Sequence, residues 1–176
     1  MKNKLLYRLT LSGLLAAVIC VMTLIAVPLP ANGYANLGDC FVIVAGVLLG
    51  PVYGPCAAAI GSILADLFLG YAVYAPATFV IKGLMALAVG LITTHLSAVK
   101  SWKAVLLIVL SAIVSELVMV LGYFLFETVL YGYGVALADT LGNSVQGAVG
   151  VVAATIICSV MSSAGLISKI KNGSKE

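Results

Sequence analysis

The sequence predicts an all-α integral membrane protein, a single bundle of six transmembrane helices over residues 1–176. Composition is the first reason: 63% of the 176 residues are hydrophobic and only 9% are charged. A soluble domain is about 45–50% apolar and about 25% charged, so this composition excludes a soluble globular domain, a disordered chain and a nucleic-acid-binding protein. Length is the second reason, because a helix of about 20 residues crosses a bilayer and the chain has room for about six crossings.

Apolar runs punctuated by proline and glycine define the expected helices. The first run meets the prolines at 28 and 30, the second meets Gly50-Pro51, and the third meets Gly70; these residue types interrupt helices. The second run is short for a full crossing, as expected where backbone bends around a protein-lined cavity. The expected helices cover residues 5–27, 39–49, 55–69, 76–98, 104–130 and 137–167.

The basic residues predict that the N- and C-termini are cytoplasmic. With the N-terminus inside and six crossings, every Lys and Arg except Lys82 falls on the inner side, in agreement with the enrichment of these residues in cytoplasmic loops. The outer connections carry tyrosines instead, which form either an interfacial belt or the flat walls of a site for an aromatic ligand. These tyrosines are Tyr34, Tyr71, Tyr74, Tyr131 and Tyr133.

Polar side chains recur at helical spacing in the outer halves of the later helices. Glu116, Tyr123 and Glu127 share one face of the fifth expected helix, and Asn143 and Gln146 share one face of the sixth. The inner halves are almost purely apolar, whereas a pore or a proton path needs polar groups along its full depth. The pattern therefore predicts a cup that opens outward and binds a small molecule.

Lys82 of the fourth expected helix belongs to the same polar region and needs a partner or a function there. It contacts a ligand, or it only neutralises a carboxylate such as Asp66, Glu116 or Glu127. In the second case the amide side chains of Asn143 and Gln146 serve only to hold helices together.

Catalytic and metal-binding motifs are missing from the sequence. It contains no GxxxxGK[ST] loop, no HExxH and no GxSxG, so we expect a protein that is not an enzyme and has no metal or cofactor of its own. The first helix instead carries small residues at four-residue spacing, which let another membrane helix approach closely. This expected docking face consists of Ser12, Gly13, Ala16, Ala17 and Cys20.

Six short motifs, in this order and spacing, resemble the substrate-binding (S) subunits of energy-coupling factor (ECF) vitamin transporters over nearly the whole chain. The motifs are Leu14-Leu15-Ala16-Ala17, Leu37-Gly38-Asp39, Gly46-Val47-Leu48-Leu49-Gly50-Pro51, Gly61-Ser62-Ile63-Leu64-Ala65-Asp66, Phe79-Val80-Ile81-Lys82-Gly83-Leu84 and Asn143-Ser144-Val145-Gln146-Gly147. The resemblance implies a prokaryotic plasma-membrane protein that binds a vitamin at its outer face. It also implies partners: a membrane coupling subunit, which docks on the small-residue face of the first helix, and two cytoplasmic ATPases that use ATP.

The resemblance places the ligand site in the loop after the first helix and in the outer parts of the fourth to sixth helices. S subunits are thought to topple in the membrane and so deliver the ligand inward. The expected substrate-binding residues are Asn32, Tyr34, Asn36, Tyr74, Lys82, Glu116, Tyr123, Glu127, Asn143 and Gln146.

The expected substrate is a flat, hydroxylated heteroaromatic compound. A pyridoxine-like or pyrimidine-like compound is favoured, and riboflavin is a further candidate. The alternative function is a self-sufficient proton-coupled carrier with Glu116 as its proton-carrying group, although such carriers usually have two related halves and none is evident here. A purely structural membrane scaffold would leave the buried charges unexplained.

Overall fold

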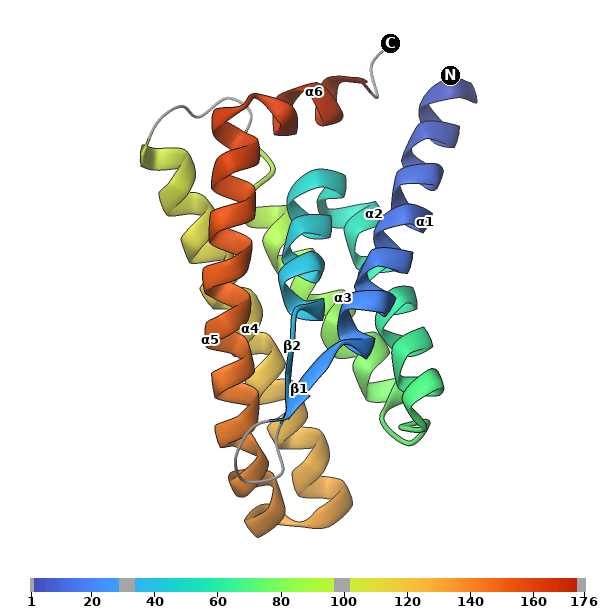
Figure 1. Cartoon of the computed structure of the whole chain (residues 1–176), viewed down its shortest axis with the longest axis vertical. Helices are drawn as coiled ribbons and strands as arrows, with labels where there is room; N and C mark the ends of the chain where they lie inside the picture. The colour runs from blue at the N-terminus through green and yellow to red at the C-terminus, as the bar shows by residue number, and fades with distance from the viewer. Residues whose placement is uncertain (1, 29–33, 97–101, 174–176) are drawn as a thin grey trace.

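The computed structural model describes residues 2–28, 34–96 and 102–173. Its helices are α1 (Lys2–Leu24), α2 (Gly38–Leu69), α3 (Ala75–Ile92), α4 (Trp102–Tyr131), α5 (Tyr133–Ser163) and α6 (Leu166–Gly173) (Figure 1). Two short strands, β1 (Ala26–Pro28) and β2 (Tyr34–Asn36), pair antiparallel between α1 and α2. The protein is thus helical, as predicted, with one small hairpin where the sequence analysis expected only a loop.

Five of the helices, α1 to α5, are long and apolar enough to cross a membrane. The prediction of six separate transmembrane helices needs correction here, because the expected helices 39–49 and 55–69 both belong to α2. At Gly50 the backbone leaves the helical conformation (φ 73°, ψ −168°), and Pro51 follows it directly. The first segment of α2, residues 38–49, is too short to span a bilayer by itself.

The chain reverses direction at Gly50. An atom in the Cβ position of Gly54 would lie 3.0 Å from the carbonyl oxygen of Ala45, although a straight helix separates residues nine apart by about 13 Å. The reversal packs against α3, where a Cβ on Gly90 would lie 2.6 Å from the carbonyl carbon of Gly50. The two segments of α2 therefore form a helical hairpin, visible in Figure 1 as its rise from β2 and its return to the start of α3.

The two ends of the bundle differ in charge. The first turns of α1, the start of α4 and all of α6 lie at one end (Figure 1), and they carry Lys4, Arg8, Lys103, Lys169 and Lys171. We call this the basic end. The hairpin β1–β2, the α2–α3 turn and the α4–α5 turn lie at the opposite end, which we call the cavity end.

Apolar side chains fill the space between the helices. Ile43 of α2, Met85 and Val89 of α3, Ile108 and Met119 of α4 are fully buried. Many other large apolar side chains are exposed on the outer faces of the spans, as a protein surrounded by lipid requires. The last expected helix, 137–167, ends earlier than predicted, at Ser163, and a further helix, α6, turns across the basic end (Figure 1). Lys171 of α6 donates a hydrogen bond to the carbonyl oxygen of Thr93 (3.0 Å).

Candidate functional site

The end of the bundle opposite the basic end contains a cavity of about 240 Å³, and α1 to α5 and β2 all contribute residues to its lining. It brings together seven of the ten predicted substrate-binding residues. These are Asn36, Tyr74, Lys82, Tyr123, Glu127, Asn143 and Gln146.

The three other predicted residues do not line the cavity or are not described. Asn32 lies outside the described residues, and for Tyr34 the structure describes only the backbone, which pairs with Pro28. Glu116 is buried behind the cavity, between α4 and α5. A Cβ on Gly150 would lie 3.2 Å from the Glu116 carboxyl carbon and 3.4 Å from Cβ of Asp39, so this glycine leaves room for both acidic side chains.

Sequence reasoning missed several residues that the fold brings to the cavity. Asp39 is part of a sequence motif and Asp66 is a possible charge partner of Lys82, but neither belongs to the predicted substrate-binding set. Their signal was present: both acids lie at the outer ends of apolar helices, at the same depth as the polar stripes. The lining residues outside the predicted substrate-binding set include Thr23, Asp39, Ser62, Asp66, Thr78 and Asp139. Tyr71 also lines the cavity, and it is one of the outer tyrosines that the sequence offered as walls for an aromatic ligand.

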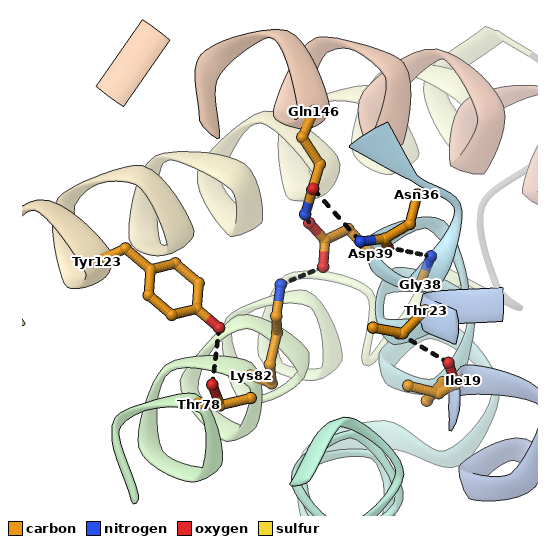
Figure 2. Close-up of polar contacts among 9 residues, drawn as sticks. All are labelled: Ile19, Thr23, Asn36, Gly38, Asp39, Thr78, Lys82, Tyr123 and Gln146. Carbon is orange, nitrogen blue, oxygen red and sulfur yellow. Dashed lines mark hydrogen bonds and ion pairs between the residues drawn. The ribbon is translucent and has the colours of Figure 1, made fainter. Parts of the chain in front are cut away.

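A buried polar network forms the floor of the cavity (Figure 2). Lys82 of α3 forms an ion pair and hydrogen bond with Oδ1 of Asp39. Gln146 of α5 donates to Oδ2 of the same carboxylate (2.7 Å) and accepts a hydrogen bond from Asn36 of β2 (3.4 Å). The side chain of Asn36 also accepts from the backbone N–H of Gly38 (2.8 Å). One carboxylate thus ties together β2, α2, α3 and α5.

Tyr123 of α4 connects the fourth helix to this network. Its hydroxyl group shares a hydrogen bond with Thr78 of α3 (3.0 Å), and the Lys82 ammonium group lies 5.5 Å from the centre of its ring (Figure 2). A cation at this distance from a tyrosine ring is attracted by the electrons of the ring. The Lys82 ammonium group is therefore paired with the Asp39 carboxylate and also lies over the ring of Tyr123.

Tyr74, in the turn before α3, is the centre of an aromatic cluster at the mouth of the cavity. Its ring centroid lies 5.3 Å from that of Phe126, 6.3 Å from those of Tyr71 and Tyr131, and 6.4 Å from that of Tyr123. Burial, and after it the nearby acidic groups, raises the pKa of the Tyr74 phenol above its ordinary value. The hydroxyl group therefore stays protonated and remains a donor at neutral pH.

Other polar atoms on the cavity wall have no hydrogen-bond partner in the described structure. These atoms are Oε2 of Glu127, Oδ2 of Asp66 and Oγ of Ser62. Glu127 is 5% exposed and Ser62 is 2% exposed. Buried polar atoms are normally hydrogen-bonded, so the cavity offers a bound molecule acceptors that the protein itself leaves unused.

The predicted docking face of α1 is divided by the fold. Ala16 and Cys20 are buried inside the protein, and Gly61 of α2 packs so closely on the Ala16 backbone that a Cβ there would clash. Gly13 and Ala17 are exposed, with open space around Gly13. Of the small residues, therefore, these two remain available on the outer surface, while Ser12 is half-buried.

The fold and the cavity together define a multi-pass membrane protein with a polar, tyrosine-lined cavity. The sequence profile of the ECF-type riboflavin transporter S component family matches residues 4–163, and the chain belongs to this family. An uncharacterized protein in the gap 3′ region of Pyrococcus woesei is 37% identical over 140 residues, which cover 77% of this chain and 88% of that protein.

Membership of this family makes the chain a subunit for vitamin uptake. The family is a transporter component, not an enzyme family, and S components work with a membrane coupling component and ATPases. It gives no support to the alternative of a self-sufficient proton-coupled carrier.

Proposed function

We propose that the chain is the high-affinity binding subunit for uptake of a flat heteroaromatic vitamin, with riboflavin as the first candidate. The observation that supports this most is the combination of an aromatic cluster around Tyr74 with a hydrogen-bonded floor around Asp39. A planar ring can stack on tyrosines, while its polar edge exchanges hydrogen bonds with Asn143 and Gln146.

Riboflavin is the first candidate substrate because the description of the matching family names it. The cavity volume supports a second candidate class. About 240 Å³ is below the range of about 300–1,000 Å³ usual for drug-sized ligands, which favours the single-ring pyridoxine-like and pyrimidine-like compounds expected from the sequence.

The proposed orientation puts the cavity end outside and the basic end in the cytoplasm of a prokaryotic plasma membrane. The Lys and Arg residues at the basic end support it. The coupling subunit would then dock beside α1, through Gly13 and Ala17, and two ATPases would supply the energy from the inside. The chain itself would use no cofactor.

Ligand titration of the purified subunit in detergent tests the proposal. Free riboflavin is fluorescent, and stacking on tyrosine quenches its emission, so binding is read directly as loss of fluorescence. Pyridoxine and a hydroxymethylpyrimidine are then added as competitors. Binding of any of the three at low concentration is the expected result, and the order of affinity assigns the substrate. If none binds and none raises the melting temperature, the cavity is not a vitamin site.

A further inference from the structure

The acidic residues of this protein are concentrated at one place. The whole sequence contains six, and Glu176 at the end of the chain lies outside the described residues. Four of the other five line the cavity and the fifth, Glu116, lies directly behind its floor. The four in the cavity wall are Asp39, Asp66, Glu127 and Asp139.

The basic residues do not balance this charge. The basic residues in the first turns of α1, at the start of α4 and in α6 lie at the basic end, opposite the cavity; among the described residues these are Lys2, Lys4, Arg8, Lys103, Lys169 and Lys171 (Figure 1). Among the described lining residues Lys82 is the basic one, and its ammonium group is already paired with Asp39. Asp66, Glu127 and Asp139 therefore line the cavity without a described salt bridge.

Two of these carboxyl groups also have an oxygen without a hydrogen-bond donor. Oε2 of Glu127 and Oδ2 of Asp66 are buried and unpartnered, and Glu127 as a whole is 95% buried, at 5% exposure. A buried acceptor without a donor is costly, and a buried carboxylate without a positive partner is more costly still. A ligand that brings a donor and a positive charge relieves both costs at once.

The aromatic cluster at the mouth favours the same kind of ligand. Tyr74 contacts three other tyrosine rings and lines the cavity together with Tyr71 and Glu127. Tyrosine faces attract cations, and groups of them bind organic ammonium ions in many proteins. Carboxylates and tyrosine rings around one space are thus complementary to a cation on a flat ring.

We propose that the substrate is a heteroaromatic vitamin that carries a positive charge, with its cationic group held by Glu127, Asp66 and Asp139 against Tyr74. This rests on the proposed function and changes the order of its candidates, because a single-ring compound with a positive charge now comes before riboflavin, which is neutral. It assigns separate roles to the acidic groups: Asp39 is neutralised by Lys82 and shapes the floor, whereas the other three provide the charge that selects the ligand. A neutral vitamin would leave that charge without a partner.

A matched pair of ligands tests the role of charge. Pyridoxamine and pyridoxine share one ring and differ in a single substituent, a protonated aminomethyl group in place of a neutral hydroxymethyl group. We expect calorimetry on the purified subunit to show pyridoxamine binding at least about tenfold more tightly. Equal or weaker binding of pyridoxamine overturns the inference.

Variants identify the groups responsible. Glu127→Gln and Asp139→Asn keep the side-chain shape and remove charge, so each should reduce the preference for pyridoxamine over pyridoxine by about tenfold. Lys103→Gln removes a charge from an exposed position at the basic end and should leave the preference intact. A preference that survives both acidic variants also overturns the inference.

Riboflavin, a neutral vitamin, separates the two proposals. If riboflavin binds tightly and pyridoxamine does not, the chain is a vitamin-binding subunit as proposed, but its acidic wall does not select a cation. If pyridoxamine, pyridoxine and riboflavin all fail to bind, the result counts against both proposals.

Discussion

Replacing Lys82 by methionine should destabilise the protein even when no ligand is present. Methionine keeps the length of the side chain and removes the ammonium group that pairs with Asp39. Loss of one partner from a buried ion pair costs about 3–5 kcal/mol. The lower end applies here, because Gln146 still donates to the remaining carboxylate at 2.7 Å. For a chain of this size, about 3 kcal/mol corresponds to a melting temperature lower by about 6–12 °C.

A double variant distinguishes the ion pair from loss of packing. Asp39→Asn combined with Lys82→Met removes both charges and leaves an amide that Gln146 can still reach. If the cost of Lys82→Met comes from the stranded carboxylate, the double variant should be more stable than Lys82→Met alone. Reaction of buried thiols with a fluorogenic maleimide measures unfolding, since Cys40 and Cys158 are buried. A Cys56→Ser background removes an exposed thiol that would react before unfolding.

Two results would refute this reasoning. One is a melting temperature for Lys82→Met within about 2 °C of the parent, since about 1 kcal/mol or less is too small for a buried ion pair that has lost one member. The other is a double variant whose loss equals the sum of the two single losses, because independent contributions mean that the two side chains do not interact.

Three further outcomes are expected. Asn143→Ala should weaken ligand binding about tenfold or more in the fluorescence titration, whereas Ser144→Ala, exposed and hydrogen-bonded within its own helix, should not; equal effects would place the ligand elsewhere. Ala17→Leu should preserve ligand binding and abolish uptake by the assembled transporter, and undiminished uptake would show that α1 docks through another face. Gly50→Ala should cost about 1–3 kcal/mol through its backbone alone, since a Cβ there meets nothing within 4 Å; a melting temperature equal to that of the parent would show that the α2 reversal tolerates other backbone angles.

The sequence predicted the helices well because hydropathy and proline or glycine punctuation are local signals. The end of the third expected helix at Leu69 agrees with the end of α2, and the expected short helix 39–49 corresponds to the first segment of α2. The reversal at Gly50 joins two expected helices into one element because Pro51 is well suited to start a helix directly after a glycine.

The position of a side chain along the helix axis and its partner on another helix were harder to predict than the face of the helix on which it lies. Glu116, Tyr123 and Glu127 share a face of α4, but Glu116 lies seven residues, or about 10 Å, from Tyr123 along the axis, which puts it behind the cavity instead of in its wall. The partner of Lys82 was also missed, because spacing along one helix carries no information on which residue of another helix it meets. Asp39 is 43 residues away in sequence, and only the packing of α2 on α3 brings the two together.

The tight contact between the first segment of α2 and α3 bears on how a bound molecule could travel. Gly46 fits against Val89 and the Ala86 carbonyl, and Gly90 fits against Gly50, with no space for even a methyl group at either glycine. Helices whose backbones pack this closely cannot slide past each other without separating. The helix segments that carry Asp39 and Lys82 therefore move as one rigid unit. When the protein reorients in the lipid, the cavity therefore moves with it unchanged. Release of the bound ligand then requires a rearrangement of the residues at the mouth of the cavity.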